Sequence, residues 1–277
     1  MVLLQAVVAA CTVLAWQAAA QPAPIKTLHV ATLNIAHGRG LAADQFGIPK
    51  EQFESNIDAV AALIKRENPD VIALQEADAS SAWSGLFDHV ARIAPTAGYE
   101  HVHHGIHMDV GGWGLQARYG TALLAHCALG DRQSITFTPQ GLHRKGFVAV
   151  TAKFDGRSIL LVSLHLDSQS VPARAKQVDV IVEALAGRNI SMIVMGDFNA
   201  RWENENDAAR QVALRLGLAA YEPESRELFT FHAARLNKRI DWILISPELE
   251  FTSYSVWPDQ VSDHLGVAAI VRWKDPK

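Results

Sequence analysis

The chain has 277 residues, of which 49% are hydrophobic and 19% are charged. This composition excludes a disordered, collagen-like or low-complexity protein, and the length allows one large domain with its own hydrophobic core. The 25 Lys and Arg and 29 Asp and Glu residues give a net charge of −4. Proteins that bind duplex DNA along its backbone are usually basic, so this balance argues weakly against that function.

The first twenty residues carry no charge, are mostly apolar and end in Ala18-Ala19-Ala20. Such a run indicates an export signal cut near Ala20, which predicts a periplasmic or secreted protein. Two alternatives stay open, because no Lys or Arg precedes Lys26. The stretch that ends at Cys11 resembles a lipoprotein cleavage site, and an uncleaved run of this length would barely span a bilayer as an N-terminal anchor.

Eight apolar segments have the composition of β-strands. They cover residues 28–35, 71–75, 121–124, 147–154, 158–165, 191–195, 240–245 and 267–273. Two helices are expected between them, one with Phe53, Ile57 and Ile64 on its apolar face and one with Val178 and Leu185. This many strands in one chain predicts a mixed α/β domain over residues 25–275, built on two sheets.

Polar side chains stand where the predicted strands begin or end. They are Asn34, Glu76, His165, Asp197, Asn199, Asp241, Asp263 and His264. Catalytic groups are often placed at strand ends, because the strands are rigid supports. Any one of these residues could be an ordinary surface group, but together, in apolar surroundings, they indicate a site.

The residue types suit metal and acid/base chemistry. Glu76 is either a surface acid or an oxygen ligand for Mg²⁺ or Mn²⁺. Asp197 and Asn199 are two residues apart, so in an extended stretch they point the same way and Phe198 points into the core; a simple turn is the alternative.

Asp263 and His264 combine a candidate metal ligand with an imidazole that works near neutral pH when a carboxylate orients it. We expect Asp241 to be that carboxylate, whereas a surface ion pair of Asp241 with Arg239 is the alternative.

His165 ends a strongly apolar segment, and a single histidine there is more often structural than catalytic. Arg174 and Gln177, on the second predicted helix, are expected to reach towards it.

Two patterns are interpreted as false leads. The run from Gly38 to Ala43 matches a dinucleotide-binding fingerprint, but Gly47 and Pro49 interrupt the helix that would have to follow. We expect this loop instead to place His37 and Arg39 beside the site, with Arg39 on phosphate.

The second pattern is a group of four histidines between residues 101 and 107, which have the ligand type for a transition metal. A solvent-facing strand and loop is the preferred interpretation. With Trp113, Gln116 and Arg118, this Gly-rich stretch is expected to form a substrate loop.

Six short motifs, taken in chain order, resemble those of the endonuclease/exonuclease/phosphatase superfamily. They are ATLNI at Asn34, LQE at Glu76, SLH at His165, GDFN at Asp197, RID at Asp241 and SDH at His264. The stretch YGTALL, which begins at Tyr119, also resembles the central strand of the family. The resemblance extends from about residue 28 to residue 273, and the family includes deoxyribonuclease-I-like nucleases, neutral sphingomyelinases and inositol polyphosphate phosphatases.

The resemblance implies a four-layer α/β sandwich with two central mixed sheets packed face to face, and a metal-dependent phosphoester hydrolase. It implies metal ligands at Asn34, Glu76 and Asp263. It implies catalytic roles for His165, Asp197, Asn199, Asp241 and His264, and substrate contacts at Arg39, Tyr119 and Asn199. The general base is left open between Asp197 and His264.

Elementary chemistry supports the expectation of a divalent metal ion at this site. A phosphodiester is anionic and repels hydroxide, and a divalent cation neutralises charge on its oxygens and leaving group. A site with carboxylates and no cysteine fits Mg²⁺ or Mn²⁺ better than Zn²⁺.

The sequence therefore predicts an exported metal-dependent phosphoesterase that works by in-line water attack. Its substrate is left open between a small phosphoester, a phospholipid head group at a membrane surface, and nucleic acid, and no obligate protein partner is inferred. An extracellular nuclease is the first alternative, with a groove of Arg39, Arg118, Arg144, Lys145, Arg201 and Arg235. A non-catalytic binding module is the second, although a pure binder needs no acid/base pair beside metal ligands.

Overall fold

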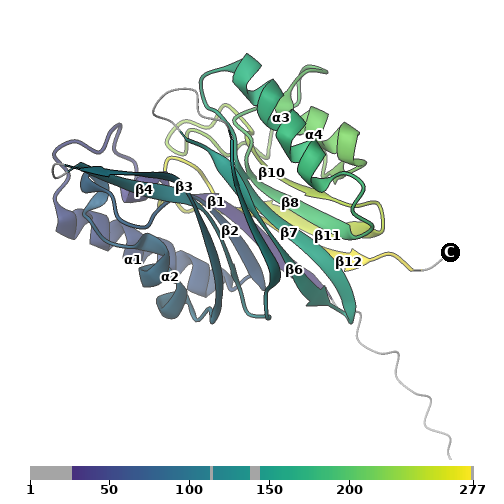
Figure 1. Ribbon diagram of the computed structural model, residues 1–277, viewed down its shortest axis with the longest axis horizontal. Helices are drawn as coiled ribbons and strands as arrows, with labels where there is room; N and C mark the ends of the chain where they lie inside the picture. Colours follow the sequence, from purple (N-terminus) through teal and green to yellow (C-terminus); the bar gives the residue numbers. More distant parts are fainter. Residues whose placement is uncertain (1–26, 113–114, 138–143, 276–277) are drawn as a thin grey trace, which may run out of the picture.

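The computed structural model describes residues 27–112, 115–137 and 144–275, which form two sheets packed face to face with helices on both outer sides (Figure 1). The first sheet holds β1 (Leu28–Asn34), β2 (Val71–Asp78), β3 (His101–Gly112), β4 (Leu115–Ala125), β11 (Leu249–Val256) and β12 (Val267–Trp273). The second sheet holds β5 (Gly130–Thr136), β6 (Gly146–Phe154), β7 (Arg157–His165), β8 (Ser191–Asp197), β9 (Ala219–Ala220) and β10 (Asp241–Ile245). The predicted four-layer α/β sandwich is confirmed.

Helices α1 (Lys50–Glu67) and α2 (His89–Ala97) cover the first sheet, and α3 (Val171–Leu185) and α4 (Ala208–Leu216) cover the second (Figure 1). Two short 3-10 turns, η1 (Ala36–Gly38) and η2 (Ala82–Ser84), follow β1 and β2. In the part of the chain that the structure describes, no helix has the length and apolar character needed to cross a bilayer.

The central strands are buried on both faces, which explains their unbroken apolar runs. In β8, Ile193 and Met195 pack between the two sheets, whereas Met192 and Val194 pack beneath α3 and α4. The pairs β1/β2 and β7/β8 are parallel. Their carboxyl ends therefore lie at one edge of the sandwich, and this edge carries the predicted polar residues.

The sequence located the interior strands better than the outer ones. Each of the eight predicted segments overlaps an observed strand, and the two predicted helices occur as α1 and α3. The strand orders are β11-β12-β1-β2-β4-β3 and β5-β6-β7-β8-β10-β9, so the four strands without a predicted apolar segment are the four sheet edges. Of these, β3 was expected in part, as the strand and loop of the histidine-rich stretch. An edge strand such as β5 is mostly exposed and polar, and it therefore lacks the apolar run that identifies a buried strand. The short helices α2 and α4 were also missed.

The histidine-rich stretch is part of β3, which pairs with β4 along its length, and is not a loop. His107 is 3% exposed and lies 2.9 Å from the Thr121 hydroxyl, so the expectation of a solvent-facing segment is wrong at this residue. Burial lowers the pKa of His107 to about 3. Gln116 and Arg118 belong to β4, and Trp113 lies outside the described residues.

A buried polar bridge joins the two sheets directly behind the predicted site. The Gln75 amide donates to the Ser163 hydroxyl at 3.2 Å and accepts from the Thr32 hydroxyl at 3.2 Å. Ser163 donates in turn to the Leu74 carbonyl oxygen. Because Gln75, Thr32 and Ser163 are fully buried, these bonds fix the position of one sheet on the other where Glu76 follows.

We expect Ser163→Ala to lower the free energy of unfolding by about 1–3 kcal/mol, because the Gln75 amide nitrogen would lose its buried acceptor. Urea unfolding followed by circular dichroism measures the change. Ser158→Ala, on the exposed start of the same strand, is the matched control and should change stability by less than about 0.5 kcal/mol. Equal losses in the two variants would contradict the role of the bridge.

Candidate active site

The predicted polar residues lie at the edge of the sandwich where β1, β2, β7 and β8 end and β10 begins. Asn34, His165 and Asp197 are the last residues of β1, β7 and β8, and Asp241 is the first residue of β10. In the second sheet Asp197 stands opposite His165 on one side and Asp241 on the other. Since β1 belongs to the facing sheet, the side chain of Asn34 reaches across to Asp197.

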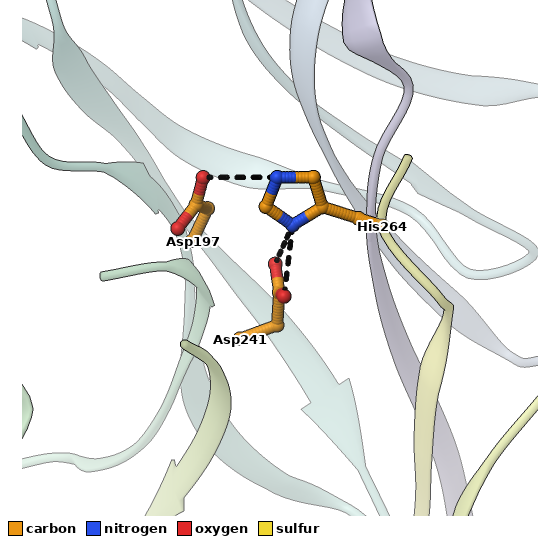
Figure 2. A group of neighbouring side chains, drawn as sticks. All are labelled: Asp197, Asp241 and His264. Carbon is orange, nitrogen blue, oxygen red and sulfur yellow. Dashed lines mark hydrogen bonds and ion pairs between the residues drawn. The ribbon is translucent and has the colours of Figure 1, made fainter. Parts of the chain in front are cut away.

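His264 lies between two buried carboxylates, as Figure 2 shows. Its Nδ1 is 2.9 Å from Oδ2 of Asp241, and its Nε2 is 3.8 Å from Oδ2 of Asp197. Asp241 also accepts a hydrogen bond of 2.5 Å from the Thr230 hydroxyl. The structure thus places Asp241 where the sequence expected the orienting carboxylate. Arg239, the alternative partner, donates instead to backbone carbonyl groups.

The charges of this group follow from its burial. Burial alone would lower the pKa of the imidazolium, but Asp241 and Asp197 outweigh it and raise the pKa of His264 to about 10. Burial raises the pKa of the Asp241 carboxyl. Although Asp197 is also buried, His264 and His165 hold the pKa of its carboxyl below the usual range. In the free protein at neutral pH, His264 is therefore an imidazolium and Asp197 a carboxylate.

Asp197 accepts hydrogen bonds from several segments of the chain. Its Oδ2 lies 3.0 Å from the Asn34 amide nitrogen, 3.1 Å from that of Asn199 and 3.3 Å from Nε2 of His165. Its Oδ1 accepts from the Asn199 backbone N–H at 2.8 Å. These contacts hold the carboxylate in one orientation.

The Asp197–Asn199 stretch combines the two alternatives that the sequence left open. The backbone turns at Asn199, where φ is +48°, so the stretch is not extended. Asn tolerates this left-handed conformation, and Asp and Asn both favour turns. Phe198 is nevertheless fully buried in the outer core of the second sheet. Both polar side chains therefore face the site, as expected from the sequence.

Glu76 is turned into the site by an irregularity of β2. The register between β2 and β4 shifts between Leu74 and Ala77, and Glu76 has a φ of +51°. Its carboxylate lies 3.3 Å from Nζ of Lys145 and 3.5 Å from both His37 and Arg39. Burial would raise the pKa of the Glu76 carboxyl, but these positive groups hold it well below its usual range. Glu76 is thus an ionised oxygen donor.

Arg39 joins the two carboxylates that were predicted to bind metal. Its guanidinium donates to Asp263 and lies 3.5 Å from Glu76. The neighbouring Ser262 hydroxyl donates to the Asn34 carbonyl oxygen at 2.7 Å, which ties this loop to the end of β1. The next α-helix, α1, begins only at Lys50, so the loop lacks the immediate helix of a dinucleotide-binding site.

Lys145, which the sequence predicts only as part of a nuclease groove, lies inside the site. It precedes β6 and is 7% exposed, with Nζ 3.0 Å from Nε2 of His165 and 3.3 Å from Glu76. Burial and the Lys145 ammonium lower the pKa of His165, which keeps that ring neutral. The only signal in the sequence is a basic residue at the start of a buried strand, and this signal does not identify its partners.

Arg174 and Gln177, on α3, bond to the backbone of Asp167, two residues beyond His165, and among the described residues their hydrogen bonds stop there. Tyr119 packs edge-on against the His37 ring at 5.0 Å and is 4% exposed. It lies behind His37 in the free protein, and its contact with substrate stays a prediction.

His37 itself forms a second carboxylate–histidine pair. Its Nδ1 lies 2.6 Å from Oδ1 of Asp78, which is fully buried. Although burial lowers it, Asp78 and Glu76 raise the pKa of His37 above its ordinary value. His37 therefore holds a proton more readily than a free histidine does, at 3.5 Å from Glu76.

The donors on that side fit a hard divalent cation. Asn34, Glu76 and Asp263 offer amide and carboxylate oxygens, the ligand types of Mg²⁺ and Mn²⁺. Arg39 already bonds both carboxylates, so an ion would share them with the guanidinium or displace it. Asp197, Asp241 and His264 also have potential ligand atoms within 4.8 Å of one another. Because both ring nitrogens of His264 face carboxylates, the group of Asp197, Asp241 and His264 is better suited to hold a proton than a metal ion.

Hydrogen bonds, ion pairs and ring contacts, some of them through His37, connect every predicted site residue into one network. It contains Asn34, Arg39, Glu76, Tyr119, His165, Asp197, Asn199, Asp241, Asp263 and His264. An ordered acid/base group therefore adjoins a cation-rich wall, an arrangement able to bind an anion and to transfer a proton.

Comparisons with known proteins agree with this fold. Residues 31–264 match a family model described as the Endonuclease/Exonuclease/phosphatase family. No curated protein matches the chain. Among solved structures, the chain is similar to an endonuclease/exonuclease/phosphatase from Beutenbergia cavernae, with 20% identity, 90% of this chain and 72% of that chain covered, and a TM-score of 0.66.

The chain is also similar to two further solved structures that carry different protein names. A mannosyl-6-phosphatase from Bacteroides thetaiotaomicron has 16% identity, with 89% of this chain and all of that chain (100%) covered and a TM-score of 0.67. TDP2 from Caenorhabditis elegans has 18% identity, with 90% and 74% covered and a TM-score of 0.62. At such identities the likeness shows the fold alone.

We expect Asp241→Asn to lower the pKa of His264 by at least about one unit, because the carboxylate that faces Nδ1 is removed. Folding raises the pKa of His264 from 6.5 to about 10. The ion pairs of His264 therefore stabilise the folded protein fully below pH 6.5, and this stabilisation is lost as the pH rises through about 10. The difference in unfolding free energy between wild type and Asp241→Asn should therefore shrink over that interval.

Histidine ring NMR measures the titration, and urea unfolding at several pH values measures the stability difference. Asp259→Asn, which removes an exposed partner of Arg66, is the control and should leave the His264 titration in place. An unchanged His264 pKa in Asp241→Asn would refute the electrostatic account.

Proposed function

The chain belongs to the endonuclease/exonuclease/phosphatase family, and we propose that it hydrolyses phosphoesters in a divalent-metal-dependent reaction at the site around Asp197 and Glu76. Members of this family are hydrolases that act on phosphoesters. The observation that carries the proposal is the position of His264, held between Asp241 and Asp197 beside the cation-rich surroundings of Glu76. A protein that only bound an anion would not need this buried, charged acid/base group.

The substrate phosphate is expected to bind against the positive and neutral donors. Arg39 and Lys145 supply positive charge, and the Asn199 amide and the neutral His165 ring supply hydrogen bonds. In the free protein these donors are held by the carboxylates and carbonyl oxygens of the site, so they reach the phosphate by exchanging those partners.

The charges of the free site favour Asp197 over His264 as the group that accepts a proton from the attacking water. Asp197 is ionised, whereas His264 is an imidazolium held by Asp241. Attack forms a new bond between the water oxygen and phosphorus, the bond to the leaving oxygen breaks, and one water proton passes to Asp197. The imidazolium then stabilises the negative charge that develops on phosphoryl oxygen.

We assign Asn34, Glu76 and Asp263 as the residues that hold Mg²⁺ or Mn²⁺, since their oxygens fit such an ion. A bound divalent ion supplies neutralisation of charge on the phosphate oxygens and on the leaving group. The net charge of −4 favours small phosphoesters or lipid head groups over long nucleic acid as substrates.

Activity is expected on bis(4-nitrophenyl) phosphate with Mg²⁺ or Mn²⁺ and should be abolished by EDTA. His264→Ala and Asp197→Ala should each lower turnover by at least about 100-fold, because each removes a group that acts on the reacting atoms. Asp179→Ala, on the exposed surface of α3, is the control and should keep the wild-type rate.

Glu76→Gln should weaken Mn²⁺ binding measured by calorimetry without substrate.

A wild-type protein that is inactive with every divalent metal on phosphomonoesters, phosphodiesters, sphingomyelin, DNA and RNA would refute the enzyme proposal. Near-normal rates in His264→Ala and Asp197→Ala would show that the chemistry takes place elsewhere. The same panel of substrates identifies the class, and a preference for DNA that is lost steeply with salt would favour the nuclease alternative.

We further propose that residues 1–20 are an export signal ahead of a domain over residues 25–275. The apolar run and Ala18-Ala19-Ala20 support this proposal, and residues 1–26 lie outside the described part of the chain. The exported protein should begin at Gln21 when its N-terminus is sequenced from the periplasm or medium. A cell-associated chain that retains Met1 would favour the anchor, and a chain that begins at Cys11 would favour the lipoprotein.

A further inference from the structure

His37 faces the predicted metal ligand Glu76 from a backbone conformation that is uncommon for residues with a side chain. His37 and the preceding Ala36 have φ values of +51° and +49°, and Glu76 has a φ of +51°. Left-handed residues of this kind persist where the surrounding structure holds them, and they are concentrated at functional sites. Both side chains that face each other here are therefore presented by a strained backbone, which indicates that their placement is specified.

The His37 ring is fixed by a carboxylate on one side and by two aromatic rings. Its Nδ1 lies 2.6 Å from Oδ1 of Asp78, which is fully buried and also accepts a hydrogen bond from the Ser84 hydroxyl. The rings of Tyr119 and Trp83 meet the imidazole edge-on, with centres 5.0 and 6.0 Å away. The Asp78 carboxylate therefore keeps the hydrogen on Nδ1, and the aromatic rings set the plane of the imidazole.

This arrangement turns Nε2 of His37 towards Glu76. Nε2 lies 3.5 Å from Oε2 of Glu76, which is longer than a good hydrogen bond. Two ligand atoms that each lie about 2.1 Å from one ion are about 3.0–3.4 Å apart at the usual angles between ligands. The observed separation is close to that range, so a small movement of either side chain would let both atoms bind one ion. The two side chains are 12% and 17% exposed, so neither is sealed from solvent.

The other two histidines of the site are less suited to bind an ion. The Nε2 atom of His165 lies 3.0 Å from the Lys145 ammonium and 3.3 Å from Asp197. A nitrogen that accepts from an ammonium group has no lone pair left for a metal. Both ring nitrogens of His264 face carboxylates. His37 instead has the arrangement of many metal-binding histidines, in which a carboxylate holds one ring nitrogen and the other nitrogen binds the ion.

We propose that His37, oriented by Asp78, is a nitrogen ligand of the divalent ion that Glu76 holds, and that it makes the site prefer transition-metal ions to Mg²⁺. This inference rests on the proposed function for the place of the ion beside Glu76. Mg²⁺ prefers oxygen ligands, whereas imidazole nitrogen suits transition metals. Metal ions and protons compete for the same lone pair, so the ion displaces any proton on Nε2.

Pulsed electron paramagnetic resonance of Mn²⁺ bound to the wild-type chain tests the assignment directly. The nuclear spin of a coordinated histidine nitrogen modulates the electron spin echo of Mn²⁺, and we expect this nitrogen coupling in the wild type. His37→Gln should remove it, because Gln offers an amide oxygen in place of the ring nitrogen. His126→Gln is the matched control and should keep the coupling, since His126 is exposed and bonds to Asp70, just before β2 begins.

Calorimetry without substrate measures the metal preference. Mn²⁺ is the weakest binder of the transition-metal series, so its comparison with Mg²⁺ is a strict test. We expect the wild type to bind Mn²⁺ at least about tenfold more tightly than Mg²⁺, and His37→Gln to lower this ratio at least about fivefold. A purely electrostatic role of His37 would change the affinities for both ions equally, because their charges are the same.

Asp78→Asn tests the orienting carboxylate. It should weaken Mn²⁺ binding by about tenfold, because a neutral amide makes the His37 ring less basic and holds it less firmly. His126→Gln should keep both wild-type affinities. Unchanged Mn²⁺ affinity in both Asp78→Asn and His37→Gln would contradict the assignment.

The wild-type spectrum decides the question even where a variant does not fold. Bound Mn²⁺ without nitrogen coupling, or a coupling that persists in folded His37→Gln, would overturn the inference. Hydrolysis of bis(4-nitrophenyl) phosphate by a chain that lacks the coupling would leave the proposed function standing. The coupling in a chain that hydrolyses no phosphoester would refute the proposed function and retain His37 as a metal ligand.

Discussion

The carboxylate of Asp197 is the group on which the site depends, because it collects hydrogen bonds from both sheets. Asn34 donates from the first sheet, His165 and Asn199 contact it from the second, and His264 approaches from the loop before β12. A buried carboxylate is costly unless its lone pairs are satisfied. The packing of the two sheets and the order of the site therefore support each other.

Around Asp197 the site separates into two halves with different tasks. One half holds a proton, since His264 lies between Asp241 and Asp197. In the other half, Glu76 is surrounded by positive groups, including Lys145 and Arg39. The carboxylates assigned to the metal are therefore already paired with side-chain cations. In the proposed function, binding of a divalent ion together with an anionic phosphate would exchange these partners, so that Arg39 and Lys145 would leave the carboxylates and become available to phosphate.

The sequence predicted the interior of the fold better than its borders. Strands such as β8 are buried on both faces and appear as continuous apolar runs, whereas the edge strands β3, β5, β9 and β11 carry polar, partly exposed residues. The same difference explains the histidines of β3. Their spacing does not reveal that Thr136, on β5 of the facing sheet, lies 3.4 Å from the His107 ring, because burial at an edge depends on a distant neighbour.

By itself the sequence determined the residue types of the site, their order and their positions at strand ends, because local apolar periodicity and short motifs are properties of neighbouring residues. Only the tertiary structure decided the partners: Asn34 with Asp197, which are 163 residues apart, and Lys145 with Glu76 and His165. Such contacts depend on strand order, register and the packing of one sheet on the other. These are set by the balance of packing over the whole chain, so no local pattern records them.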